Sequence, residues 1–344
     1  MKFRKLLAPL AFAALAPALG HAQEVVTLKV AHFLPPISPA HSKFIVPWCD
    51  KIAAESQGKM KCQIYPAMQL GGTPPQLINQ ARDGVADIVW TLPGYTPGRF
   101  PVSEVFELPF VTSTHEASSR AAWDFAEKHA KNELAGLQPI GVWVNGPNVF
   151  HFRDKEVKTL EDLKGMKVRA PSRLGTKLLA ALGATPVGMP VPQMAESLSR
   201  GVIEGALVPW EVVPSTKAHE LTKFHAEMPG NKSMTTATMV FVMNKKRYDS
   251  LPAELKKVID NNSGRETSAW ISAQFKGADA GVRDAALKRG NKVYQISEAE
   301  AVKWENASKS VAEEWIKEVS AKGLDGQKLY DEAVALVKQY SEQK

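Results

Sequence analysis

Strand-like and helix-like segments alternate at short spacing in the first third of the chain. Residues 25–31 (VVTLKVA) alternate between apolar and polar side chains and predict a strand, as do residues 61–65 and 87–90. Between them, residues 41–55 and 74–84 carry apolar side chains at helical spacing. Strands alternating with helices predict parallel strands covered by helices.

The middle of the chain repeats this pattern, and the last part is predominantly helical. Further strands are expected at residues 139–144, 150–152, 166–169, 185–187, 206–208 and 238–243. Helices at 173–182 and 192–200 are each followed by a glycine, Gly183 and Gly201. From Leu251 onward helices dominate, with Pro252 in a first helical turn and later helices at about 299–322 and 326–340. The pattern predicts two α/β lobes between which the chain crosses more than once, with a ligand cleft between them.

The amino terminus has the order of features found in secretory signals. Lys2, Arg4 and Lys5 precede an apolar stretch at residues 6–19, and the small residues Gly20 and Ala22 flank a cleavage position. The sequence predicts a signal peptide at residues 1–22, a mature chain from about Gln23, and export to the periplasm. An uncleaved anchor helix is the alternative, although the apolar run is short for a membrane span.

Charge and composition narrow the range of partners. The chain has 344 residues and a formal net charge of +7, and the signal segment carries three of the positive charges and no acidic residue, which leaves +4. This modest surplus without a long basic run argues against nucleic-acid binding. This net charge is only weakly compatible with anionic ligands. The length of the chain suggests about two domains.

The two cysteines, Cys49 and Cys62, both fall in the predicted mature chain. In an exported protein such a pair is a candidate disulfide. Two buried free thiols are the alternative, because spacing alone does not fix the Cα geometry.

Motifs for catalysis, cofactors and metals do not stand out in the sequence. It contains no GxGxxG, GxxxxGK[ST], GxSxG or HExxH motif, and its eight histidines form no i, i+4 ligand pair. We therefore expect no enzyme activity, no cofactor and no metal site.

Several segments together resemble one family. Residues 160–172 (LEDLKGMKVRAPS) look like the signature of the DctP-type substrate-binding proteins of TRAP (tripartite ATP-independent periplasmic) transporters. Residues 182–187 (LGATPV) and 201–206 (GVIEGA) follow in the same order as in that family, and residues 69–72 and 84–88 also fit. The resemblance covers nearly all of the predicted mature chain.

The resemblance implies a two-lobed periplasmic binding protein fold that closes over a carboxylate, with a long helix linking the lobes. Lobe I would comprise residues 23–147, completed by about 237–275. Lobe II would comprise residues 148–236, completed by about 276–344. The partners would be a small organic carboxylate and the membrane subunits of a TRAP transporter.

Two arginines are the candidate carboxylate ligands. The family's ligand-gripping arginine corresponds to Arg169, and a planar guanidinium can hold a carboxylate through two parallel hydrogen bonds. A surface or interlobe ion pair is the alternative for Arg169. Arg173, at the start of a predicted helix, could reach the same anion, and a solvated helix residue is its alternative.

Aromatic residues suggest a bulky ligand. Many relatives have an asparagine before the proline where this chain has Val208-Pro209-Trp210, so an apolar contact replaces a polar one. Trp210, Trp90, Phe33 and Tyr95 are candidate cleft residues, with core packing as the alternative for each. Together they favour a bulky or aromatic monocarboxylate over a small dicarboxylate such as succinate.

Polar side chains near strand ends complete the candidate site. Asn145 and Asn148 could orient the ligand, although turn formation also explains them. His32 and Thr91 lie at the ends of two predicted strands, where open α/β sheets hold their ligands.

Three functions fit these features. The leading hypothesis is the binding protein of a transporter. The second is an extracytoplasmic sensor that presents a carboxylate to a membrane kinase. The third is an enzyme on a related two-lobed scaffold.

Overall fold

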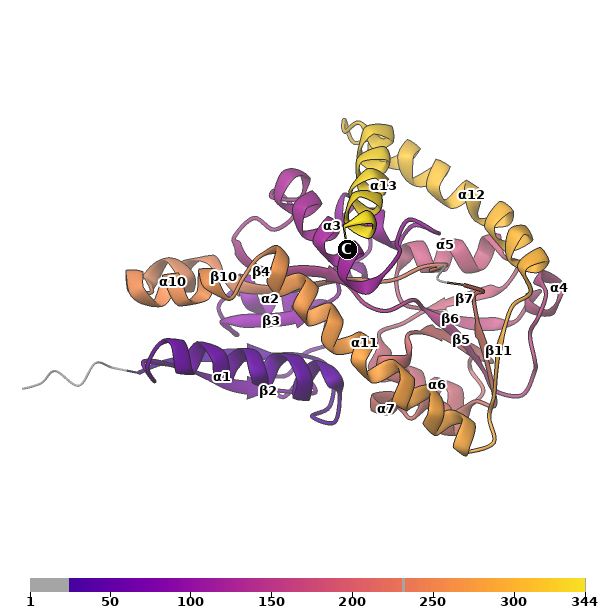
Figure 1. Ribbon diagram of the computed structural model, residues 1–344, viewed down its shortest axis with the longest axis horizontal. Coiled ribbons are helices and arrows are strands. Elements are labelled where there is room, and N and C mark those ends of the chain that lie inside the picture. Colours follow the sequence, from indigo (N-terminus) through magenta and orange to yellow (C-terminus); the bar gives the residue numbers. More distant parts are fainter. Residues whose placement is uncertain (1–24, 231–232, 344) are drawn as a thin grey trace, which may run out of the picture.

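The computed structural model describes residues 25–230 and 233–343 (Figure 1). The predicted signal segment at 1–22 and the new terminus at Gln23 lie outside the described residues. Within the described ranges, no helix combines the length and apolar character needed to cross a membrane.

The first sheet has five strands in the order β2-β1-β3-β10-β4. Its strands are β1 (Val26–Ala31), β2 (Met60–Tyr65), β3 (Ile88–Thr91), β4 (Leu137–Val144) and β10 (Thr238–Asn244). Strands β1, β2 and β3 pair in parallel, as predicted, whereas β10 runs antiparallel to both β3 and β4. The sheet is therefore mixed. Every residue of β10 is buried, which explains why this strand is a continuous apolar run rather than an alternating one.

The second sheet has six strands in the order β11-β9-β5-β8-β6-β7. Its strands are β5 (Val149–Phe152), β6 (Lys167–Ala170), β7 (Thr185–Gly188), β8 (Gly205–Val208), β9 (Phe224–Glu227) and β11 (Lys292–Gln295). Strand β5 is antiparallel to β8 and β9, so this sheet is mixed too. The sequence pattern missed β9, and it missed β11 inside the segment expected to be helical.

Helices and helical turns cover both sheets. They are η1 (Ala40–Ile45, a π-helix), α1 (Val46–Glu55), η2 (Pro74–Gln76), α2 (Leu77–Arg82), η3 (Pro93–Tyr95), η4 (Ser103–Glu107), α3 (His115–His129), α4 (Leu160–Leu163), α5 (Arg173–Ala181), η5 (Val191–Gln193), α6 (Met194–Ser199), η6 (Trp210–Val212), α7 (Val213–Thr216), α8 (Ala218–Leu221), α9 (Lys245–Ser250), α10 (Ala253–Asn261), α11 (Arg265–Lys288), α12 (Glu298–Ser320) and α13 (Gly326–Glu342).

Local sequence explains the ends of α5, the helix that follows β6. The Ser172 hydroxyl accepts a hydrogen bond from the Gly175 N–H at 3.3 Å, which caps the first turn. Gly183 has a φ of +88° just after the helix, a conformation that favours glycine and ends the helix as predicted.

Two chain crossings between the sheets lie against each other. The first is the turn at residues 145–148, and the second precedes β10. The N–H of Asn145 donates to the Ala237 carbonyl at 3.2 Å, and the N–H of Asn148 donates to the Thr235 carbonyl at 2.9 Å. Hydrogen bonds between the crossings fix the turn at the point where the sheets meet.

Long helices also join the two halves. Helix α11 packs against α3 and β4 of the first half and against η6 and β11 of the second, and Figure 1 shows it in orange running across both. Helix α12 packs on α5, but α13 packs on α3 and η4 beside the first sheet. Residues 276–344 were predicted to complete the second lobe; within them, α12 contacts the second half and α13 contacts the first.

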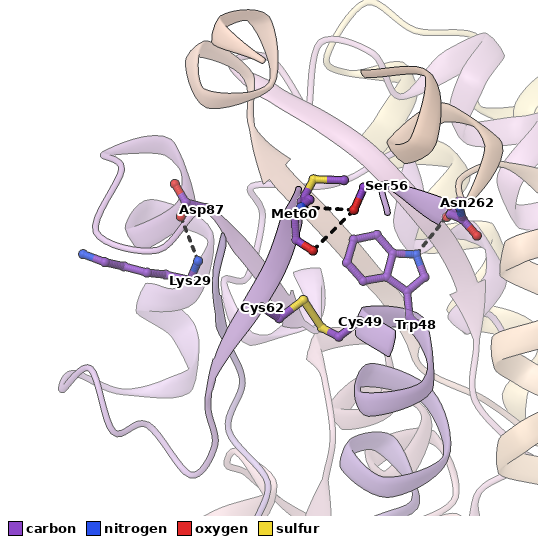
Figure 2. The surroundings of a disulfide bond; sticks show 8 residues. All are labelled: Lys29, Trp48, Cys49, Ser56, Met60, Cys62, Asp87 and Asn262. Atoms are coloured by element: carbon purple, nitrogen blue, oxygen red, sulfur yellow. Dashed lines mark hydrogen bonds between the residues drawn. A yellow bond between two sulfur atoms is a disulfide. The ribbon is translucent and has the colours of Figure 1, made fainter. Parts of the chain in front are cut away.

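A disulfide joins Cys49 of α1 to Cys62 of β2, with the Cα atoms 5.7 Å apart (Figure 2). Next to it, the Trp48 indole N–H donates to the Asn262 carbonyl at 2.9 Å, and the Met60 N–H donates to the Ser56 hydroxyl at 3.0 Å. The disulfide and the Met60–Ser56 hydrogen bond fasten α1 to edge strand β2, and the Trp48–Asn262 hydrogen bond ties α1 to the end of α10. None of these residues lines the cavity between the sheets.

Candidate functional site: a cavity between the two sheets

A narrow cavity with a volume of about 20 Å³ lies between the two sheets. Six of the residues predicted to bind ligand line it: Phe33, Trp90, Tyr95, Asn145, Asn148 and Arg169. The rest of the lining is apolar: Leu34, Leu92, Pro171, Val191, Val208, Pro209, Val212, Ala237 and Met239. Strands of both sheets and both crossing segments contribute residues, so a molecule in this cavity touches both halves of the protein.

Arg169 is the one charged residue among the described residues of the lining, and its side chain is almost completely buried, with 1% exposed. Its Nε donates to the Met189 carbonyl at 3.0 Å, and Nη1 donates to the Leu207 carbonyl at 2.8 Å. The Nη2 atom has no hydrogen-bond partner among the described residues. Burial lowers the pKa of Arg169, although the neighbouring Tyr95 hydroxyl raises it in part. The guanidinium is oriented by the Met189 and Leu207 carbonyls and lies beside the Tyr95 hydroxyl, and Nη2 has no acceptor within hydrogen-bond distance among the described residues.

Three aromatic rings form one wall of the cavity. Phe33 stacks on Trp90 with the ring centroids 4.6 Å apart, and Tyr95 meets Phe33 edge-on at 5.6 Å. The Tyr95 hydroxyl accepts a hydrogen bond from the Val191 N–H at 3.2 Å across the cavity, and burial raises the Tyr95 pKa. Flat apolar faces beside a single cation suit a flat apolar body that carries one negative charge.

The two asparagines of the crossing turn differ in how their side chains are used. Asn145 Oδ1 accepts from the Ala237 N–H at 2.7 Å, which ties the two crossings together. Asn148 is 4% exposed, and neither its Oδ1 nor its Nδ2 has a partner among the described residues. The indole N–H of Trp90 is also buried without a partner.

Arg173, predicted as a second carboxylate ligand, is not among the residues that line this cavity. Its Nη2 lies 2.5 Å from Glu104 Oε2, and its Nη1 lies 2.5 Å from Glu318 Oε2. Glu318 is bound in turn by Lys177 at 2.6 Å. Two carboxylates therefore already occupy the donors that would face an anion. These ion pairs join η4, α5 and α12.

Comparisons with known proteins assign this architecture. Residues 30–318 match the family model DctP, described as bacterial extracellular solute-binding protein, family 7. A TRAP solute-binding protein from Rhodoferax ferrireducens T118, solved with copurified benzoate, is 47% identical and superposes with a TM-score of 0.91 over 93% of this chain and 99% of that one.

Two further relatives give the same picture. A marine metagenome TRAP solute-binding protein described as specific for aromatic acid ligands, solved with 3-hydroxybenzoate, is 44% identical with a TM-score of 0.91, over 93% of this chain and 100% of that one. The protein named outer membrane transporter protein TsaT, from Comamonas testosteroni, is 28% identical over 96% of this chain and 97% of its own length.

The chain belongs to the DctP family. It is a solute-binding protein of the TRAP type with the two-lobed fold that the resemblance implied. Members of this family bind solutes rather than transform them, and they work with membrane permease subunits. The relatives give no support to the alternative of a sensor that serves a membrane kinase.

Trp210 also lies outside the cavity lining of this DctP-family protein, although its neighbour Pro209 lines it. Its indole N–H donates to Glu227 Oε1 at 2.9 Å, and its ring packs against His151 and His225 with centroids 5.0 and 5.1 Å away. The predicted flat face therefore packs inside the second half. Val208, directly before Pro209, brings an apolar side chain to the cavity lining.

His32 and Thr91 are buried at strand ends but do not line the cavity. The His32 ring nitrogen Nε2 lies 3.0 Å from His41 Nδ1, and burial, with His41 second, lowers the His32 pKa to about 3. The Thr91 hydroxyl donates to the Pro74 carbonyl at 3.4 Å. Both side chains are buried in the first half, and His32 Nδ1 has no hydrogen-bond partner among the described residues.

Sequence reasoning missed two buried carboxylates: Glu104, which pairs with Arg173, and Glu107, which accepts a hydrogen bond from the Thr238 N–H at 3.1 Å. Glu104 and Glu107 are 3% and 1% exposed, and they fall in SEVFELPF at 103–110, where apolar residues surround both. Charged residues inside an apolar run are a signal of burial, because such residues are rarely buried without partners. That signal was present, but the sequence does not tell which cation they meet.

Proposed function

We propose that this protein binds an aromatic monocarboxylate in the cavity around Arg169 and delivers it to TRAP membrane subunits in the periplasm. The observation that carries the proposal is the buried Arg169 guanidinium, whose Nη2 has no partner among the described residues and which adjoins the aromatic wall. A buried cation is costly unless an anion or several hydrogen bonds accompany it. A ligand carboxylate supplies the missing acceptor.

The cavity lining favours one carboxylate and a flat body. Because Arg169 is the single charged group of the described lining, a second carboxylate on a short diacid would be buried without a cation. The stacked pair Phe33–Trp90 offers contact area to a ring. Two relatives that are 47% and 44% identical were solved with benzoate and 3-hydroxybenzoate, which supports the same ligand class here.

Lobe closure follows from the placement of the cavity. Trp90 belongs to the first sheet, and Arg169 belongs to the second. A ligand that touches both stabilises the closed arrangement, since a ligand shifts an equilibrium by its differential affinity for the two states. We assign residues 23–147 and about 237–275 to one lobe and residues 148–236 to the other, with α12 packed on the second lobe. The exported chain would begin at about Gln23.

Matched acids test the charge and the ring separately. Calorimetric titration with benzoate should give binding, whereas benzamide, which has the same shape without the charge, should bind at least about a hundredfold more weakly. Succinate should also bind weakly, and small-angle scattering should show a smaller radius of gyration with benzoate. Binding of benzamide at the affinity of benzoate, or a preference for succinate, contradicts the proposal.

A further inference from the structure

Asn148 carries a hydrogen-bonding capacity that the fold does not use. Its backbone N–H is bound to the Thr235 carbonyl at 2.9 Å, so the turn is held by main-chain groups. Its side chain is buried and lines the cavity, yet both Oδ1 and Nδ2 lack a partner among the described residues. Asn145, in the same turn, uses its Oδ1 to bind the Ala237 N–H. Turn formation therefore accounts for Asn145 but leaves the Asn148 side chain unexplained.

The unpaired polar atoms of the cavity are not all of one kind. Arg169 Nη2, Trp90 Nε1 and Asn148 Nδ2 are donors, and a carboxylate accepts from donors of this kind. Asn148 Oδ1 is an acceptor, and an ionised carboxylate has no hydrogen to give it. A ligand that carries a hydrogen-bond donor as well as its charge would satisfy this acceptor. Exchanging the two Asn148 side-chain atoms would not alter this conclusion, because both are unpaired.

We propose that Asn148 recognises a hydroxyl group on the ligand, so that the preferred solute is a hydroxylated aromatic monocarboxylate. Asn148 Oδ1 accepts the hydroxyl hydrogen, and Asn148 Nδ2 or Trp90 Nε1 donates to the hydroxyl oxygen. Arg169 Nη2 holds the carboxylate. This inference rests on the proposed function, since it assigns the polar end of the ring in the same cavity.

The expected discrimination follows from the cost of an unpaired buried acceptor. An acid without the hydroxyl leaves Asn148 Oδ1 unsatisfied in a narrow, largely apolar cavity, and sites built to bind a hydroxyl reject the analogue that lacks it. A penalty of this kind corresponds to about tenfold or more in affinity.

The unmodified protein gives the first test, by calorimetric titration with benzoate, the three hydroxybenzoate isomers and the three fluorobenzoate isomers. Fluorine has nearly the size of a hydroxyl group but cannot donate a hydrogen bond. At least one hydroxybenzoate should bind about tenfold or more tightly than both benzoate and its fluoro counterpart. If every hydroxybenzoate binds no better than its fluoro counterpart, the inference is overturned.

The variant Asn148→Leu assigns the preference to this side chain. Because the Asn148 side chain has no partner among the described residues, Leu removes its polarity without breaking a bond that the structure shows. In Asn148→Leu the affinity ratio between the preferred hydroxybenzoate and its fluoro counterpart should fall to within about threefold. A hydroxyl preference that persists in Asn148→Leu overturns the assignment. Failure of the proposed function looks different, because benzamide would then bind as well as benzoate.

Discussion

Arg169 and Arg173 are only four positions apart in the sequence, but they lie in different regions and have different kinds of hydrogen-bond partner. In the cavity, Arg169 on β6 is buried and bound to two backbone carbonyls, with Nη2 left free. At the start of α5, Arg173 is held by two carboxylates, Glu104 and Glu318. A guanidinium that is oriented by neutral carbonyls keeps its charge available for a ligand. One that is neutralised by carboxylates serves the stability and geometry of the fold.

Buried acidic residues lie near Arg173 rather than near Arg169. Glu104 and Glu107 lie in η4 beside Arg173, whereas no carboxylate lines the cavity among the residues that the structure describes. A carboxylate in the cavity would compete with an anionic ligand for Arg169. Keeping the acidic residues beside Arg173 leaves the cavity open to anions. The following predictions probe this contrast and are ordered by the expected effect on ligand affinity.

Removal of Arg169 should have the largest effect on binding. Truncating one partner of a buried charge pair costs about 2–5 kcal/mol, or roughly thirtyfold to several thousandfold in affinity. Arg169→Ala should abolish measurable binding of benzoate in a calorimetric titration while the circular dichroism stays unchanged. Arg169→Lys should also bind poorly, because an ammonium lacks the planar arrangement of donors. Binding within about threefold of the original would show that Arg169 is not the anchor.

Removal of Arg173 should act mainly on stability. Arg173→Ala leaves Glu104 buried without its cation, and the loss of such a partner costs about 3 kcal/mol. Denaturant unfolding should show this loss. Because Arg173 joins elements of both halves, its loss should lower the binding affinity of every acid by the same factor, about tenfold or less. Complete loss of binding with unchanged stability would reverse the roles assigned to the two arginines.

The carboxyl group of Glu107 should make stability depend on pH with a small effect on binding. Burial raises the pKa of Glu107 from 4.5 to about 7. The folded state therefore binds more protons than the unfolded state between these pH values, and this contribution to stability is lost as pH rises from about 4.5 to 7. Unfolding titrations at several pH values should show that Glu107→Gln removes this part of the decline.

Other groups set the control for that measurement. Burial beside Glu211 also raises the pKa of Asp279 to about 7, so Asp279 contributes to the same decline of stability with pH. Burial lowers the pKa values of His115 and His225 to about 4. These two histidines make the folded state more stable as pH rises from about 4 to 6.5, which opposes the decline. The difference between Glu107→Gln and the unmodified protein isolates Glu107. A curve for the variant that stays parallel to the original would contradict the raised pKa.

The disulfide should affect ligand affinity least. Replacing Cys49 and Cys62 by serine should lower the free energy of unfolding by about 3 kcal/mol, as chain-entropy models give for a loop of this size. Benzoate affinity should stay within about threefold, because neither residue lines the cavity. Mass spectrometry of the exported protein should show the two peptides linked. Two alkylated thiols under denaturing, non-reducing conditions would contradict the bridge.

The sequence pattern predicted those helices and strands whose formation depends on residues close together in the chain. The alternation in Val26–Ala31 and the glycine after α5 specify a strand and a helix end from the residues themselves. Strand β10 was recognisable because its apolar run reflects burial on both faces. Strands β9 and β11 have four residues each and pair in parallel with each other across 68 positions, Phe224 with Lys292. Such short segments carry too little periodicity to reveal a partner so far away.

The candidate site also has features that depend on nearby residues and features that depend on distant ones. The sequence by itself determined the order of most elements, the family resemblance and a cavity that contains Arg169, the aromatic wall and the asparagine turn. Only the tertiary structure separated Arg169 from Arg173 and Asn148 from Asn145. Glu104 and Glu318 lie 69 and 145 positions from Arg173, and Ala237 lies 92 positions from Asn145. Whether a polar side chain is free for a ligand depends on partners that folding brings from distant segments, and no local pattern records them.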